Sequence, residues 1–193
     1  MKRDLKKHIS TIIFAAFVLV ILFVPVAKAK LIQGLMEIGL FKPDVSEDQK
    51  YTNADLSAIK FKDAKGNTLS LGDLKGKIIF LNFWATWCPP CLAEMPSINK
   101  FYEQYKNDEE VVFLMIDADS DFPKAQAYLN RKSYKFKVYT FASDIPKSIF
   151  AGSLPTTIVF DKKGRIAMNG VGAANYASKE FLTFIKKLKD LKE

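Results

Sequence analysis

The sequence predicts an α/β fold in which a central mixed β-sheet is flanked by helices on both faces. Apolar runs of strand length alternate along the chain with segments whose apolar residues recur every three or four positions, as on a helix face. Two further pairs of short strand-like segments flank turns that contain glycine, which is typical of β-hairpins. The 193 residues are 49% apolar and 13% aromatic, enough for the core of one domain with an appendage.

Each element of this fold has its own signal. The run 78–84 is continuously apolar, as in a strand buried on both faces. The residues that follow continue at helical spacing as far as 106, and Pro96 predicts a kink there. In chain order the expected elements are a hairpin of 57–62 and 68–71, the strand 78–84, the helix ending at 106, a strand at 111–116, a helix at 123–131, a strand at 136–141, a hairpin of 157–160 and 166–169, and a closing helix at 181–191.

A basic tail and an apolar run open the chain. Residues 1–10 hold four Lys or Arg against one Asp, and residues 12–27 are almost wholly apolar. Two interpretations are open: a transmembrane anchor over 11–30, or a signal peptide cleaved at the small-residue site 27–29. A crossing helix needs about 17–25 residues. The run is long for a signal peptide, and Lys28 lies within the cleavage site, so the anchor is preferred. In both cases the basic tail is cytoplasmic and the rest of the chain is exported.

The segment between the apolar run and the first strand divides in two. Residues 31–41 could lie along the membrane interface as an amphipathic extension, although two glycines weaken a helix there. Residues 42–53 contain Pro43 and several polar side chains, which predicts a linker. The expected organisation is a basic cytoplasmic tail at 1–10, the anchor or signal peptide at 11–30, a juxtamembrane segment with linker at 31–51, and the α/β domain at 52–193.

Charge and ligand-forming residues argue against several classes of function. The formal net charge is +8, but no arginine-rich or aromatic-interleaved patch is present, so nucleic-acid binding is not expected. Residues 117–121 imitate the start of a calcium loop, but Phe122 and Tyr128 stand where Gly and Glu are needed, which favours a solvated loop. A zinc site lacks ligands, because the one histidine, His8, lies in the tail. We therefore expect no metal and no cofactor apart from a redox-active disulfide.

The two cysteines of the chain, Cys88 and Cys91, form a C-x-x-C pair between the strand 78–84 and the helix after it. A cysteine at a helix start lies beside unpaired backbone N–H groups and the positive end of the helix dipole, which favours the reactive thiolate. Cys91 lies on the same side of the first turn and can close a short disulfide. The pair predicts dithiol–disulfide exchange, with Cys88 attacking and Cys91 resolving. Pro89 and Pro90 remove two N–H donors, so milder acidity is expected than in strongly oxidising C-x-x-C sites.

The cysteines belong to a larger set of motifs. Residues 81–91 are LNFWATWCPPC, residues 94–96 are Glu-Met-Pro, and residues 154–157 are Leu-Pro-Thr-Thr before a later strand. Over about residues 52–192 this set resembles the thioredoxin fold. More closely, it resembles the membrane-anchored thiol–disulfide oxidoreductases of the TlpA/ResA type, in the AhpC/TSA–redoxin-like branch of the thioredoxin superfamily.

The resemblance implies roles for particular residues. Pro155 is expected to be the cis-proline that faces the disulfide, and Leu154 and the exposed aromatic Trp87 are expected to bind substrate with it. Glu94, three residues after Cys91, matches an acidic residue of the ResA-like branch. On a helix it shares a face with Cys91, so it is either a catalytic proton-handling group or a solvated surface residue.

The predicted function is that of an exported-side reductase of protein disulfides on the bacterial cytoplasmic membrane, supplied with electrons by a membrane partner. The resemblance implies apocytochrome c before haem attachment as one substrate class. Asn82 departs from the buried Asp that thioredoxins usually have six residues before the first cysteine. A thiol peroxidase remains an alternative, although Leu81 and Ala85 replace the Pro and Thr of its motif. A second alternative is a non-catalytic membrane-tethered binding module whose disulfide is purely structural. A disulfide that closes so short a loop constrains little of the unfolded chain, so it would stabilise the fold only weakly.

Overall fold

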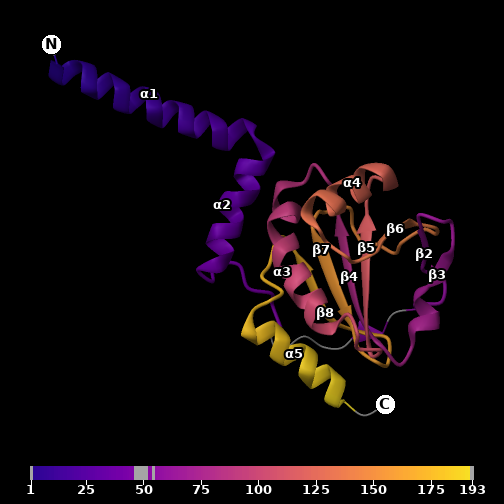
Figure 1. Ribbon diagram of the computed structural model, residues 1–193. Helices are drawn as coiled ribbons and strands as arrows, with labels where there is room; N and C mark the ends of the chain where they lie inside the picture. The colour runs from indigo at the N-terminus through magenta and orange to yellow at the C-terminus, as the bar shows by residue number, and fades with distance from the viewer. Residues whose placement is uncertain (1, 46–51, 54, 192–193) are drawn as a thin grey trace.

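The computed structural model describes residues 2–45, 52–53 and 55–191, with side chains described at 8–45 and 55–191. In this part of the chain one mixed sheet has eight strands in the order β1-β8-β7-β4-β5-β6-β2-β3 (Figure 1). The predicted α/β fold with a mixed central sheet is confirmed. In chain order the elements are α1 (Lys2–Phe23), α2 (Pro25–Glu37), β1 (Thr52–Asn53), β2 (Lys60–Asp63), β3 (Thr68–Ser70), the 3-10 helix η1 (Leu71–Leu74), β4 (Ile78–Trp84), α3 (Pro89–Tyr105), β5 (Val111–Asp117), α4 (Phe122–Lys132), β6 (Val138–Phe141), β7 (Thr156–Phe160), β8 (Arg165–Val171) and α5 (Lys179–Asp190).

The central strand β4 is buried along its whole length. It pairs in parallel with β5 and antiparallel with β7, so neither edge is open. Its side chains alternate between two apolar clusters, with Phe80 and Trp84 in one and Leu81 and Phe83 in the other. This double burial explains why the sequence of β4 is apolar without interruption.

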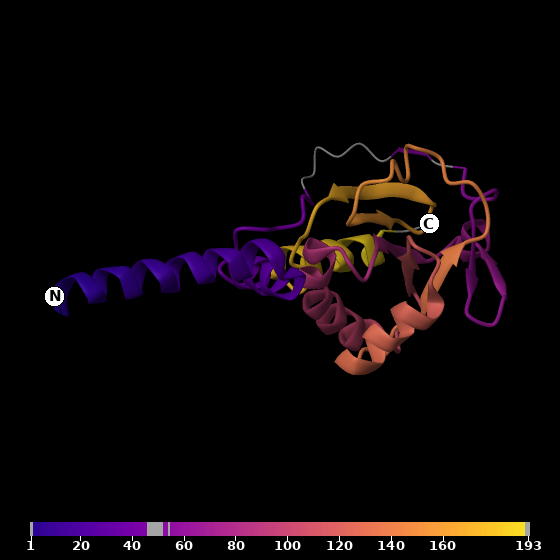
Figure 2. The ribbon, with the colours of Figure 1, turned by 90° about the horizontal axis from the view of Figure 1, so that it is seen from above.

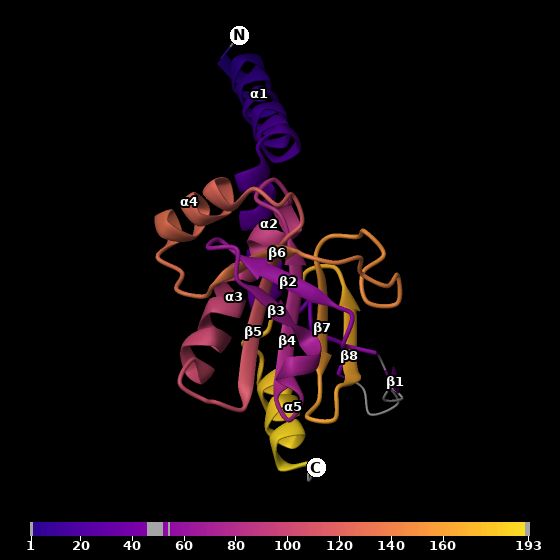
Figure 3. The same cartoon turned by 90° about the vertical axis from the view of Figure 1, so that its right-hand side faces the viewer.

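Within the described residues, α-helices contribute to one of these two clusters. The cluster that contains Phe80 includes residues of α3, α4 and α5. Figure 3 shows these three helices beside the sheet. The opposite cluster is closed by η1 and by loop residues, among which Phe150 stacks on Phe83 with 4.2 Å between ring centroids. The expectation of helices on both faces is therefore wrong. The covering segment 142–155 has two prolines and no helical spacing of its apolar residues, so it packs as a loop.

The two hairpin turns have the same pattern of hydrogen bonds to an aspartate. β2 pairs with β3, and β7 pairs with β8, both antiparallel. Asp63 and Asp161 each begin a turn, and one carboxylate oxygen of each accepts two backbone N–H groups from the residues that follow. Gly66 and Gly164 adopt φ values of +83° and +76°, which a residue with a Cβ rarely adopts.

The N-terminal apolar run does not form one helix. α1 projects from the domain and ends at Phe23, and α2 begins at Pro25 (Figures 1 and 2). Val24 between them is extended because the proline ring disfavours a helical conformation in the residue before it. No single helix among the described residues has the length and hydropathy to cross a membrane, whereas the pair, bent by 94°, meets that test together. The single helix expected over 11–30 is thus not observed.

α2 lies against the domain. Met36 is 3% exposed and forms a small apolar cluster with Ala29 and with Ala93 of α3. The expected extension along the membrane interface is therefore replaced, in its helical part, by packing on α3. Of the expected linker, 46–51 lies outside the described residues, and Thr52–Asn53 is not linker but strand β1, paired with β8.

Candidate active site

The strand β4 delivers Cys88 to the start of α3. Cys88 is the N-cap of α3, with Pro89 as the first helical residue, and its sulfur is bonded to that of Cys91. Because Pro89 and Pro90 have no N–H, the first donor of the helix is the backbone N–H of Cys91, which donates to Cys88 Sγ at 3.3 Å. The helix start therefore offers this sulfur the backbone N–H of Cys91, whereas Pro89 and Pro90 offer it none.

The two sulfurs differ in access. Cys91 is completely buried, whereas Cys88 is 3% exposed and borders an open hollow of about 480 Å³. Cys91 is not part of the lining. An incoming group can therefore approach Cys88 and not Cys91, as required of an attacking and a resolving thiol. The hollow is lined by Trp87, Cys88, Pro89, Pro90, Ala118, Asp119, Phe150, Gly152 and Leu154.

The Leu154–Pro155 peptide bond is cis, as expected. The strand register pairs Thr156 of β7 with Phe83 of β4, so this peptide lies at the same edge of the sheet as the cysteines. Leu154 lines the hollow, whereas Pro155 is buried and its carbonyl accepts the N–H of Gly172 at 2.9 Å. Leu154 is thus the one of the two whose side chain lines the hollow.

Trp87 lies on the rim of the hollow and is 56% exposed. Its indole N–H donates to Asp119 Oδ2 at 2.7 Å, which fixes the ring beside Cys88. The role of Asp119 was missed from the sequence, where residues 117–121 were expected to be a solvated loop. That expectation is wrong for Asp117, which is buried at the end of β5 with its pKa raised by burial. Among the described residues, no group of three or more His, Cys, Asp or Glu side chains is arranged to hold a metal.

Glu94 is fully buried, one turn of α3 after Cys91, so it is not a solvated surface residue. Its Oε1 accepts a hydrogen bond from Asn82 Nδ2 at 2.7 Å, and its Oε2 accepts one from the backbone N–H of Ala174 at 3.3 Å. Neither partner is charged. Burial therefore dominates and raises the pKa of Glu94 to about 8, against the smaller lowering by these two hydrogen bonds.

Asn82 connects Glu94 to further buried polar groups. Its Nδ2 also donates to Thr157 Oγ1 at 2.9 Å. Tyr176 is buried beside them, and burial, with the nearby Glu94 charge, raises its pKa well above the ordinary value. Within this group Glu94 is the side chain that can change its charge near neutral pH. Sequence reasoning missed Thr157 and Tyr176 as members of this group, although Thr157 is the last residue of the Leu-Pro-Thr-Thr motif.

This fold and cysteine site agree with the relatives that the sequence matches. The sequence model of the Redoxin family matches residues 43–183. The chain belongs to the Redoxin family. It is 39% identical over 114 residues to the thiol-disulfide oxidoreductase ResA of Bacillus thuringiensis, covering 57% of this chain and 64% of that protein. It is 31% identical over 143 residues to ResA of Halalkalibacterium halodurans, covering 72% of this chain and 81% of the relative. The chain thus spans slightly less than two thirds of the first of these proteins.

A solved structure supports the fold. The thiol:disulfide interchange protein, a thioredoxin family protein from Chlorobium tepidum, aligns with a TM-score of 0.55 and 26% identity, covering 73% of this chain and 98% of that one. The resemblance to a thioredoxin-like, ResA-type protein, inferred from the motifs around Cys88 and Pro155, is therefore confirmed.

Proposed function

We propose that this protein is a thiol–disulfide oxidoreductase that reduces disulfides in exported proteins with its Cys88–Cys91 pair. The observation that supports this function best is the unequal access to the two sulfurs. Cys88 borders the hollow and lies at the helix start, whereas Cys91 is sealed behind it. The similarity to ResA, named a thiol-disulfide oxidoreductase, supports the same class of activity.

The proposed reaction has two exchange steps. The Cys88 thiolate attacks one sulfur of a substrate disulfide, which forms a mixed disulfide and releases the other substrate sulfur as a thiolate. Cys91, deprotonated, then attacks the sulfur of Cys88, which releases the second substrate thiolate and leaves the Cys88–Cys91 disulfide. Two electrons pass to the substrate, whose thiolates take up protons. A membrane-embedded electron donor must return two electrons to Cys88–Cys91 before the next cycle.

Glu94 is the proposed proton acceptor for Cys91. A general base works best when its pKa lies near the working pH, and burial raises the pKa of Glu94 to about 8. Glu94 follows Cys91 by one helical turn, whereas Asn82, at the position of the thioredoxin Asp, cannot titrate. We assign the proton transfer to Glu94 for this reason.

Trp87 and Leu154 form the proposed substrate-binding surface, with cis-Pro155 behind them. The hollow beside Cys88 has mainly apolar walls and is open, which suits an extended polypeptide segment next to its disulfide. Apocytochrome c before haem attachment is one substrate class of this kind. The part of the predicted anchor 11–30 that lies in α1 would hold the domain on the extracytoplasmic side of the bacterial cytoplasmic membrane, with the basic tail inside, whereas Ala29 of α2 packs on the domain.

Single-cysteine variants test the assignment. Cys91→Ser should accumulate mixed disulfides with partner proteins, because Cys88 can still attack and nothing resolves the product. Cys88→Ser should trap none and should abolish disulfide reduction. Non-reducing gels after acid quenching and alkylation measure both, and the same alkylation in cells should find the native pair mostly reduced. Mixed disulfides on Cys91, or a native pair that is almost wholly oxidised in cells, would overturn the proposal.

A further inference from the structure

We call the buried surroundings of the Glu94 carboxyl the Glu94 chamber, and alanines stand next to Glu94 and to its backbone partner along the chain. Ala93 precedes Glu94 on α3, and Ala173 precedes Ala174, whose N–H donates to the Glu94 carboxylate. Small side chains like these can shield a carboxyl from water only in part. Some other part of the molecule must therefore exclude water from this side, since Glu94 is fully buried.

α2 covers this position. Ala29 and Met36 of α2 are buried in one cluster with Ala93, against which Ile32 of α2 and Ala173 also pack. In Figure 1, α2 runs beside α3. The residues just after α2 are attached as well, because the carbonyl of Phe41 accepts the N–H of Asn175 at 3.1 Å, and Lys42 forms an ion pair with Glu180 at 3.0 Å.

The packing of α2 on α3 leaves a narrow opening. A crevice of about 50 Å³ lies between the two helices, lined in part by Met36 and Ser97. The hydroxyl of Ser97 donates to the backbone carbonyl of Glu94 at 2.8 Å and accepts the backbone N–H of Tyr176 at 3.1 Å, so a residue that lines the crevice contacts the backbone of two residues of the Glu94 site. Separation of α2 from α3 would widen this crevice toward Glu94.

We infer that α2 is the outer wall of the Glu94 chamber, and that Ala29 and Met36 act as positioning residues by keeping water away from this carboxyl. The N-terminal helix is then part of the proton-handling site and not a spacer alone. The consequence of this wall for the reaction rests on the proposed role of Glu94 as proton acceptor. The exclusion of water from Glu94 can be measured without that role.

Loss of this wall should change the titration of Glu94. The Glu94 carboxyl accepts hydrogen bonds from Asn82 of β4 and from the backbone N–H of Ala174, and Tyr176 ahead of α5 is the titratable side chain near it. The charged residues of α2 do not enter the chamber, because Lys30 and Glu37 are exposed and Lys28 is partly so. Burial is the largest cause of the raised pKa, so hydration of the chamber should lower it from about 8 toward 4.5.

The experiment uses the full chain in detergent micelles with the disulfide oxidised. The variant Ala29→Gln/Met36→Gln adds bulk and polarity to the buried face of α2 without adding charge. Its control is Leu31→Gln/Leu40→Gln, at two exposed positions of the same region. The infrared carbonyl band of the protonated carboxyl, identified by its loss in Glu94→Gln, is followed against pH. The first variant should lower the Glu94 pKa by at least about one unit, a tenfold change in protonation ratio, and the control should not shift it.

Two outcomes would overturn the inference: an unchanged Glu94 pKa in the Ala29→Gln/Met36→Gln variant, or an equal shift in the control. If the two glutamines reduce the yield of folded protein, Met36→Ala provides the comparison, with a smaller shift in the same direction, and no shift in that variant also overturns the inference. If Glu94→Gln leaves the reduction rate intact, the proposed proton transfer fails while the pKa comparison still decides whether α2 is the wall.

Discussion

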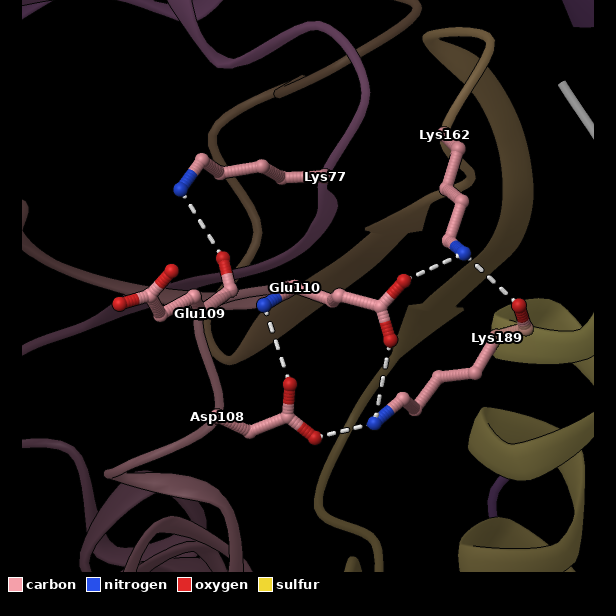
Figure 4. A network of polar contacts seen from close by, with 6 residues as sticks. All are labelled: Lys77, Asp108, Glu109, Glu110, Lys162 and Lys189. Atoms are coloured by element: carbon pink, nitrogen blue, oxygen red, sulfur yellow. Dashed lines mark hydrogen bonds and ion pairs between the residues drawn. The ribbon is translucent and has the colours of Figure 1, made fainter.

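Two regions of the molecule hold carboxyl groups at different ends of β4, and the surroundings of these carboxyls differ in burial and in nearby charge. Near the cysteines, Glu94 is fully buried and bonded to an amide and a backbone N–H. Near the start of β4, Asp108 and Glu110 face Lys162 and Lys189 at partly exposed positions (Figure 4). We call these four residues the ionic cluster. The backbone carbonyl of Glu110 accepts the N–H of Ile78, the first residue of β4.

The opposite surroundings shift the carboxyl pKa values in opposite directions. Hydrogen bonds from Lys189 to Asp108, and from Lys162 to Glu110, hold the pKa values of these carboxyls below their usual range. Burial raises the pKa of Glu94 to about 8 because no cation compensates. The carboxyls of the ionic cluster are therefore charged and paired at neutral pH, whereas Glu94 can gain or lose a proton near neutral pH. The lowered pKa of a carboxyl beside a surface lysine therefore does not predict the pKa of a carboxyl that is buried near the cysteines.

Glu94→Gln tests the largest effect. With a folded-state pKa of about 8 against 4.5 when unfolded, Glu94 takes up a proton on folding between these pH values, so its contribution to stability is complete below pH 4.5 and is lost as the pH rises through 8. Stability should fall by about 1.4 kcal/mol per pH unit across this window, and Glu94→Gln should remove that slope. Disulfide reduction near pH 7 should fall by roughly 100-fold.

Denaturant unfolding of the oxidised protein at several pH values measures the slope, because no free thiol then titrates. An identical slope in the native chain and in Glu94→Gln would show that Glu94 titrates like an exposed carboxyl. An unchanged reduction rate would remove Glu94 from the proposed mechanism.

Asn82→Ala tests the amide side of the same site. The variant leaves Glu94 Oε1 and Thr157 without their buried partner, which should cost about 2–3 kcal/mol of unfolding free energy. Since the Asn82 hydrogen bond lowers the pKa of Glu94, its removal should raise that pKa further. Thr157→Val is the matched control, because it removes the other partner of Asn82 and leaves the bond to Glu94 in place. Equal pKa changes in the two variants would contradict this assignment.

Structural features that depend on a local sequence pattern could be predicted from the sequence alone. Double burial makes β4 a continuous apolar run, and the position of Cys88 between that run and a helix predicts its place at the helix start. The burial of Glu94 could not be predicted, because the groups that contact its carboxyl, Asn82 and the backbone of Ala174, come from segments far away along the chain. The loop cover of one sheet face was missed for a similar reason, since Phe150 packs there without any periodic signal.

Trp87→Ala should have a smaller effect, and mainly on rate. The ring is exposed beside Cys88, so its removal should lower the rate of disulfide reduction about tenfold, which corresponds to ~1.4 kcal/mol. Stability should change by less than about 1 kcal/mol because little core packing is lost. Trp87→Phe keeps an aromatic surface but loses the hydrogen bond to Asp119, and separates the two contributions. A large loss of stability with unaltered kinetics would place Trp87 in the core.

Lys189→Met should have the smallest effect and shows how the ionic cluster differs from Glu94. Lys189 contacts Asp108 and Glu110 from a partly exposed position, so the change should cost less than about 1 kcal/mol at low salt and still less at high salt. The lowered pKa of Asp108 means that this contribution is present above the unfolded-state pKa and is lost as the pH falls, the reverse of Glu94.

Lys186→Met, at an exposed position of the same helix, controls for charge and helix propensity. Unfolding midpoints at pH 4 and pH 7, each at two salt concentrations, measure the difference between the variants. A salt-independent loss of several kcal/mol would mean that the cluster is as well shielded from water as Glu94, and the contrast between the two ends of β4 would fail.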